Sequence, residues 1–354
     1  MRKILLVLLL IALPVTASAQ EQSVPLEQII LQQHLTQKEL ERTLQSIKAE
    51  EAKTNSDIAR LEIDLQRQKL KIQALRRQAG KVAHAYYTGE RPTLLTLLFE
   101  AENFNQLLLM FDFYQFLYQR DMNRLEAYHT EQEKMNAMRT EQTERLETLA
   151  TLRKTYEGRL AEMLAVQAEK ERNVQMLDDP SSVQALMDHL LIDWQKRGLP
   201  AFQKFFATLS EVMLQVPELA TSERIRSNGL FSHTFTITQD DFNQFLASKN
   251  ELFEQSRFVF EDNQLIVEGS YDHMQLKITG NYELVSPTHL KFHINSLHFD
   301  GFELPQATVE EMEKMYDLGF YPELISPNVF VERLTLADEQ LRLHLKLQFG
   351  FFPQ

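Results

Sequence analysis

The chain has 354 residues, a formal net charge of −13 and no cysteine. Without cysteine there are no disulfides and no thiol chemistry, so packing alone must stabilise the fold. The acidic balance argues against nucleic acid as a partner and against electrostatic binding to anionic lipid or anionic wall polymers. The length is typical of about two domains.

Residues 1–19 have the pattern of a secretory signal peptide. Arg2 and Lys3 precede the apolar run "ILLVLLLIAL", and Ala17-Ser18-Ala19 offers a cleavage site of small residues. A membrane anchor is the alternative, but the apolar run is shorter than the ~20 residues that span a bilayer. We therefore expect cleavage after Ala19 and a secreted, extracytoplasmic protein of the cell envelope.

Residues 22–178 contain two heptad patterns on either side of one interruption. From Leu26 to Tyr86 and from Leu125 to Leu177, seam positions recur at alternating steps of three and four, which is typical of a coiled coil. Each run has roughly 60 residues and would span ~90 Å, and matched lengths predict one antiparallel coiled-coil hairpin. A single solvated helix and a homodimer are the alternatives. Pro180 in "DDPSS" cannot continue the second helix.

Several seam positions carry polar side chains where a stable zipper would have leucine or isoleucine. They are Gln33, Gln37, Glu51, Gln68, Arg139, Arg153 and Lys170. A polar residue at a seam position lowers stability while it restricts register and partner. We therefore expect a stem that bends or opens locally and acts as a lever or a binding surface.

The interruption, residues 88–118, predicts a small helical tip. Gly89 and Pro92 end the first helix, "TLLTLLFE" forms a short helix, and Asn103 to Gln106 starts the next one with a capping box. Five residues are expected to close a small core with the returning helix: Tyr86, Tyr87, Leu94, Leu97 and Leu98. Phe113, Tyr114 and Tyr118 are then left over for an exposed patch that marks a partner, unless every apolar side chain is buried.

The tip resembles a known family. Its elements are an aromatic-Gly turn (Tyr86, Tyr87, Gly89), a Leu-rich helix (Leu94, Leu97, Leu98), Asn103 with Phe104, and a returning helix with Tyr114, Tyr118 and Asp121. This arrangement resembles the coiled-coil tip of the EnvC-type murein hydrolase activators and is similar to the N-terminal domains of PcsB- and CwlO-like peptidoglycan hydrolases. The resemblance covers residues 22–178 and is specific around 83–125. Thr88 departs from it, since Gram-negative relatives often have Arg there.

The resemblance implies that the hairpin docks the extracellular domain of an FtsX-like ABC transporter and so controls wall cleavage, as in cell division. The residues expected to bind this partner are Tyr87, Gly89, Leu94, Leu97, Leu98, Phe104, Met110, Tyr114 and Tyr118. A peptidoglycan hydrolase is a second expected partner.

No catalytic domain of that family is recognisable in the rest of the chain. Hydrolases of the NlpC/P60 and CHAP types need a cysteine, and LytM-type zinc enzymes need an H-x-x-x-D and an H-x-H in a β-rich domain. His189 and Asp193 form the first motif within a predicted helix, but no H-x-H exists. We expect no enzyme activity, catalytic residue, cofactor or metal, and a degenerate zinc enzyme is the alternative.

Three further histidines, His289, His293 and His298, lie in one predicted strand. His289 and His293 would share a face of an extended strand and His298 would not, so surface histidines are expected there. Asp240 and Asp241 are expected to cap a helix, with Thr238-x-x-Asp241 as its capping box.

The second half of the chain predicts an α+β domain. Residues 179–220 form a helical linker whose amphipathic helices are split at Gly198 and Pro200. Residues 221–354 alternate as long strands with two helices, Gln239 to Leu252 and one after Pro305 that stops at Gly319. The expected fold is therefore α+β and multidomain: a coiled-coil hairpin followed by a curved antiparallel sheet with helices in its concavity.

Eighteen of the 23 phenylalanines lie from residue 202 onward. They form either an ordinary core or a groove for a lipid or acyl chain. The sequence therefore supports an exported regulator or adaptor of peptidoglycan hydrolysis, with a lipid-binding module on a coiled-coil spacer as the alternative.

Overall fold

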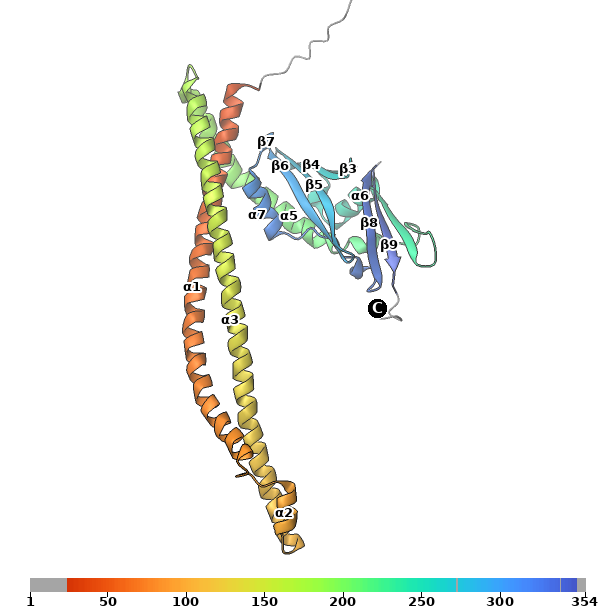
Figure 1. Ribbon diagram of the computed structural model, residues 1–354. Helices are drawn as coiled ribbons and strands as arrows, with labels where there is room; N and C mark the ends of the chain where they lie inside the picture. The colour runs from red at the N-terminus through yellow and green to blue at the C-terminus, as the bar shows by residue number, and fades with distance from the viewer. Residues whose placement is uncertain (1–23, 272, 338, 349–354) are drawn as a thin grey trace, which may run out of the picture.

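A computed structural model describes residues 24–271, 273–337 and 339–348. It contains two parts, an arm of long helices and a body of helices and sheets (Figure 1). The expected signal peptide at residues 1–19 lies outside the described residues. Within these ranges, no helix combines the length and the apolar character needed to cross a bilayer.

The arm consists of α1 (Leu26–Tyr87), the short α2 (Leu94–Glu100) and α3 (Phe104–Gln175). α1 and α3 lie side by side and run antiparallel (Figure 1). Arg145 pairs with Asp57 at 3.0 Å, and Arg153, further along α3, pairs with Glu51, further back along α1, at 2.9 Å. The chain therefore returns along its own first helix.

Burial along the arm follows the predicted seam unevenly. On α1 most seam residues are buried, including Leu40, Leu44, Ile58 and Ile72, whereas the buried residues of α3 are Asp121, Met135 and Leu149. Arg139, Leu146 and Arg153, three predicted seam residues of α3, are exposed. The antiparallel pairing is thus present, while continuous coiled-coil packing stays a prediction.

The helix ends of the arm have local causes that the sequence predicted. Gly89 has φ +75°, which glycine adopts without the steric penalty of a Cβ, and it follows the end of α1. Asn103 caps α3 by accepting the N–H of Gln106 at 2.9 Å. α3 ends at Gln175, and Pro180 opens α4 (Pro180–Asp193) behind the Asp179 cap.

The expected division at Gly198 and Pro200 is present, but the chain stays helical through it. A π-turn, η1 (Trp194–Gly198), joins α4 to α5 (Leu199–Met213), and Pro200 lies in the first turn of α5. A Cβ built on Gly198 would lie 2.6 Å from the Trp194 ring and 2.7 Å from the Phe299 ring. Gly198 therefore serves close packing rather than helix termination.

The body contains two antiparallel sheets among the described residues, where we expected one curved sheet. The first has the order β1-β2-β9-β8 and the second β3-β4-β5-β6-β7. The strands are β1 (Ile225–Ser227), β2 (Ser232–Thr238), β3 (Ser256–Glu261), β4 (Gln264–Tyr271), β5 (Met274–Ser286), β6 (His289–Phe299), β7 (Phe302–Glu303), β8 (Val329–Ala337) and β9 (Gln340–Leu347).

Two helices accompany the sheets near their predicted positions. They are α6 (Gln239–Lys249), which is extended by a short turn at Glu251–Phe253, and α7 (Gln306–Met315). Thr238 caps α6 by accepting the N–H of Asp241 at 3.1 Å, so the predicted cap is confirmed. Further short 3₁₀ turns lie at Val216–Leu219 and Pro322–Leu324.

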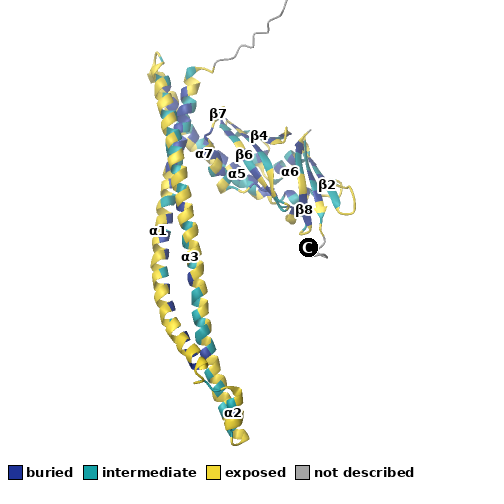
Figure 2. Ribbon diagram, viewed as in Figure 1, coloured by how far each residue is buried: buried dark blue, intermediate teal, exposed yellow. Residues whose placement is uncertain are grey.

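The main core of the body is aromatic. α5 contributes Phe202, Phe205 and Phe206, which pack with phenylalanines of α6 and β3. Figure 2 shows this burial concentrated in the body, while most of the arm is exposed or half-buried. The segment 179–220, which we expected to be a linker, thus supplies the helix around which the core of the body forms.

Side-chain amides cover both edges of the second sheet. Asn243 of α6 accepts the N–H of Phe258 and donates to its carbonyl oxygen, both at 2.8 Å. At the other edge, Gln32 of α1 makes the same two-way contact with the backbone of Glu303 in β7. Backbone groups that are already paired cannot pair with strands of other molecules. The arm therefore protects one residue at this edge of the sheet.

The arm and the body meet at Glu39 of α1. This residue is buried, with 1% of its surface exposed. One carboxylate oxygen accepts the indole N–H of Trp194 at 2.6 Å, and the other accepts the hydroxyl of Thr308 in α7 at 3.0 Å. Arg42, which also pairs with Glu311 of α7, donates to the same carboxylate at 3.1 Å. We call these residues the Glu39 junction.

Replacing Glu39 with alanine should loosen the body on the arm. The substitution leaves the buried Trp194 N–H and Thr308 hydroxyl without an acceptor, which should cost on the order of 3 kcal/mol of unfolding free energy. Denaturant unfolding followed by tryptophan fluorescence measures this, since Trp194 is the only tryptophan. The matched control is Glu41→Ala, whose partly exposed pair with Lys38 should contribute less than about 1 kcal/mol. Equal losses in the two variants would contradict the junction.

A second buried group near the junction is His34, whose two ring nitrogens have no hydrogen-bond partner. Burial, together with the charges of Lys170 and Lys38, lowers the pKa of His34 to about 4, and the charges of Asp188 and Glu41 partly oppose this shift. His34 is therefore neutral in the folded protein at pH 5 and above.

His34 should make stability depend on pH in one window. The unfolded chain binds this proton near pH 6.5 and the folded chain only near pH 4, so the unfolded state holds more protons between them. The contribution of His34 to the free energy of unfolding should be constant above pH 6.5. It should fall by up to about 3 kcal/mol as the pH drops towards 4. In His34→Leu the loss between pH 7 and pH 4.5 should be smaller than in the wild type. The control is His129→Leu, which removes an exposed histidine and should lose as much stability over this pH range as the wild type. Equal losses in all three proteins would show that His34 does not cause the pH dependence.

Candidate functional site

The candidate site is the tip of the arm, defined here as residues 86–121 and located at the end opposite the body (Figure 1). After Gly89 the chain turns back, and the N–H of Arg91 donates to the carbonyl oxygen of Ala85 at 3.2 Å. Thr93 caps α2 by accepting the N–H of Thr96 at 3.2 Å. The Asn103–Gln106 box begins α3 as predicted, except that the Gln106 side chain accepts the N–H of Glu102.

An ion pair fixes this turn to α3. Arg91 Nε donates to Asp121 Oδ2 at 2.7 Å, and the carboxylate of Asp121 has no exposed surface. The hydrogen bond to Asp121 raises the pKa of Arg91, and burial together with the Asp121 charge raises the pKa of Tyr86. Asp121 Oδ1 has no hydrogen-bond partner, and Arg124 lies 3.6 Å away. The turn is therefore attached by one charged contact.

The expected small core of the tip is mostly missing. Of the five residues expected to form it, only Leu97 is buried, while Tyr86, Tyr87, Leu94 and Leu98 are exposed. Leu97 is buried because α2 packs against α3 on one side only. The other apolar residues of α2 lie around its remaining surface, since they cover more than half of the helix circumference and leave only the side of Thr96 and Glu100 polar.

The tip instead carries a large exposed apolar surface, seen as exposed residues at the lower end of the arm in Figure 2. In the described part of the chain, thirteen of its large apolar side chains are exposed. They are Tyr86, Tyr87, Leu94, Leu95, Leu98, Phe99, Phe104, Leu108, Leu109, Phe111, Phe113, Phe116 and Tyr118. We call this set the tip surface.

The structure places the predicted partner-binding residues in three groups. Tyr87, Leu94, Leu98, Phe104 and Tyr118 belong to the tip surface, and Met110 and Tyr114 are half-buried beside it. Tyr114 stacks on Tyr118 with ring centroids 6.1 Å apart. Leu97 is buried and supports the surface from inside, and Gly89 makes the turn.

The expected list of binding residues omitted several large members of the tip surface. Leu95, Leu108 and Leu109 are exposed although they adjoin residues that were chosen. The available signal was the apolar run itself, because a short helix whose apolar residues cover more than half of its circumference cannot bury them all against one neighbour.

The histidine motifs are not gathered into one cluster among the described residues. In the described ranges, no three His, Asp or Glu side chains converge closely enough to hold a metal ion. His189 and Asp193 pair at 3.0 Å on the exposed face of α4. His289 stacks on Tyr321, and His293 pairs with Glu283 at 2.8 Å.

The expectation that His298 faces away from His289 and His293 is wrong. A β-bulge places Ile294 opposite Gly280 but Ser296 opposite Thr279, so β6 has one extra residue, Asn295. The extra residue shifts the alternation, and burial moves from the even positions before it to the odd positions after it. His298 therefore shares the less buried face with the other two histidines. His289 and His293 are still separated by roughly 13 Å along the strand.

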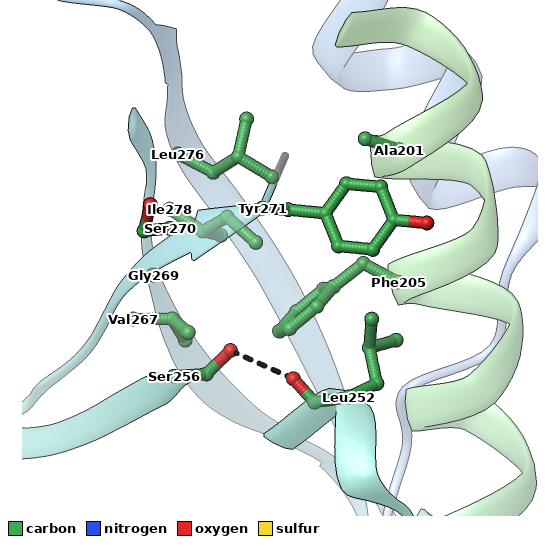
Figure 3. A pocket seen from close by; sticks show the side chains of 10 residues that line it. All are labelled: Ala201, Phe205, Leu252, Ser256, Val267, Gly269, Ser270, Tyr271, Leu276 and Ile278. Atoms are coloured by element: carbon green, nitrogen blue, oxygen red, sulfur yellow. Dashed lines mark hydrogen bonds between the residues drawn. The ribbon is translucent and has the colours of Figure 1, made fainter. Parts of the chain in front are cut away.

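Two apolar cavities inside the described body are small. Tyr271 points from β4 towards Ala201 and Phe205 of α5 over an apolar cavity of about 20 Å³ (Figure 3). A second apolar cavity, bordered by Phe235, Phe260 and other core residues, also measures about 20 Å³. Sites for small molecules typically measure ~300–1,000 Å³.

A wider recess of about 530 Å³ lies outside Tyr271, but its lining is largely polar, with Lys204, Asn250, Glu251, Glu254 and Gln255 among the residues. Its chemistry does not match a hydrocarbon chain. These three hollows therefore give no support to the lipid alternative.

The Arg91–Asp121 pair can be tested through the turn that it holds. In Asp121→Ala the Arg91 side chain loses its acceptor, so residues 88–100 should exchange their amide hydrogens faster while the body keeps its protection. Hydrogen exchange with mass spectrometry on the full chain measures both regions. Asp112→Ala removes an exposed carboxylate from the same helix and should change neither. Unchanged protection of the turn in Asp121→Ala would show that the ion pair does not hold it.

Comparison of the whole sequence with models of known protein families gives no match, and no curated protein matches the chain either. Membership of the EnvC-like family therefore stays a prediction from the residues around 83–125.

Proposed function

We propose that this protein is an exported, non-enzymatic adaptor of the cell envelope. Through its tip it docks the extracellular domain of an FtsX-type membrane transporter, and it thereby regulates peptidoglycan hydrolysis. The single observation that carries this proposal is the tip surface, in which thirteen large apolar side chains stay exposed at one end of the arm. Exposed apolar clusters of this kind are typical of protein-interaction sites. The resemblance of residues 83–125 to EnvC-type tips supplies the class of partner.

The arm in this proposal is a coiled-coil hairpin that holds the tip roughly 70 Å from the Glu39 junction, at 1.5 Å per residue along α1. Polar contacts across its seam support this role. Lys170 donates to Gln37 at 2.6 Å, and Asn173 donates to Gln33 at 3.0 Å. Polar pairs at seam positions fix the register of two helices at some cost in stability. These polar pairs therefore support one alignment of the two helices, beside the buried apolar seam residues of α1.

The body is the part that responds to docking. The Glu39 junction connects α1 to α7 and to the π-turn before α5, so a displacement of the arm reaches the core of the body through hydrogen bonds. In the proposal, a peptidoglycan hydrolase binds the body or is released from it when the tip is docked. The chain itself has no cysteine for a hydrolase of the thiol type.

The docking is tested with the purified full chain and the purified extracellular domain of the FtsX-type transporter from the same organism. Phe99→Ser should weaken binding by about tenfold or more, because an aromatic side chain at the centre of an interface often contributes 2 kcal/mol or more. Biolayer interferometry measures the affinities, and circular dichroism confirms that the variant is folded.

The matched control is Leu230→Ser in the β1–β2 loop of the body, since Leu230 and Phe99 are each 87% exposed. This variant should bind like the wild type. Absence of binding by the wild type, or equal weakening in both variants, would rule out docking through the tip.

A further inference from the structure

The tip surface is bordered by negative charge. Between residues 88 and 118 the acidic side chains are Glu90, Glu100, Glu102 and Asp112, and all four are exposed. None of them forms a salt bridge within the described residues. We call these four carboxylates the acidic rim.

The positive charges near the tip surface offset the acidic rim only in part, because residues 86–121 hold five acidic and two basic side chains. Arg91 is the only basic residue between 88 and 118, and it pairs with the buried Asp121. Arg120 lies against the ring of Phe116 at 6.0 Å from its centroid. The tip surface therefore presents apolar side chains surrounded by unpaired carboxylates.

This charge pattern disfavours two occupants. Segments that lie in the interface of anionic bilayers carry Lys and Arg beside their apolar face, and the tip carries Glu and Asp there instead. A second copy of the tip would bring two acidic rims together, and like charges across an interface oppose association. A protein surface with positive charges around an apolar centre meets neither obstacle.

We infer that the partner's docking surface is an apolar groove edged by lysine or arginine side chains. This inference rests on the proposed docking function and specifies the chemistry of its partner. The apolar centre provides most of the affinity, and the acidic rim accelerates association and excludes anionic membranes. Because exposed charges are screened over about 8 Å at physiological ionic strength, association should slow as salt is added.

The first experiment reverses the rim in the full chain with Glu100→Lys, Glu102→Lys and Asp112→Lys together. Binding to the FtsX-type extracellular domain should weaken by about tenfold or more, mainly through slower association. The association rate of this variant should no longer fall as salt is added. The matched control carries Glu144→Lys, Glu147→Lys and Glu157→Lys, which change the total charge by the same amount at exposed positions of α3 without a salt bridge. It should keep wild-type affinity.

The second experiment does not need that partner. The wild type should stay in the supernatant when vesicles of phosphatidylcholine and phosphatidylglycerol are sedimented, and the rim-reversed variant should bind them. Sedimentation of the wild type with these vesicles would overturn the inference.

The outcomes separate the inference from the proposed function. If the wild type binds the extracellular domain and both triple variants bind equally well or equally poorly, docking stands and the acidic rim is not its determinant. If the wild type does not bind that domain, the proposed function fails, and the vesicle result alone decides whether the rim excludes anionic surfaces.

Discussion

The geometry of this protein depends on one buried carboxylate. Glu39 accepts hydrogen bonds from Trp194, 155 residues away, and from Thr308, 269 residues away, so it joins the arm to two separate elements of the body. Apolar contacts tolerate sliding, whereas hydrogen bonds to one carboxylate restrict the direction of each partner. The salt bridges around it, Arg159–Glu310 and Lys314–Glu50, are partly exposed and contribute little stability. Glu39 therefore sets the angle at which the arm leaves the body.

A fixed angle has consequences at the distant end. When α1 tilts at the Glu39 junction, the displacement grows with distance along the helix. A small tilt there therefore moves the tip by a large distance. Between these two points, the seam of α3 is only partly buried, and Leu146 in its middle is exposed. The arm is therefore best packed near the body, around residues 30–44. In the proposed function, the tip is coupled to the body through this part of the arm.

The features that the sequence predicted correctly have local causes. Asn103, Thr238 and Pro180 determine helix ends through contacts within a few residues, and the structure has each of them. The errors arose where distant segments decide. The role of Gly198 depends on Phe299, a residue about 100 positions away, and the bulge at Asn295 depends on the pairing of β6 with β5. Two sheets rather than one follow from β2 pairing with β9, which no local pattern reveals.

The tip was located by its sequence, but the extent of its exposed surface was not. The folded tip buries few of its apolar side chains. Leu97 of α2 is buried, whereas Phe99 of α2 and Leu109 of α3 are exposed. Its turn is held by the Arg91–Asp121 pair and by the caps of α2 and α3. Folding alone therefore does not require leucine and phenylalanine at the exposed positions, where polar residues would also improve solubility. That excess of apolar side chains is best explained by burial against a partner.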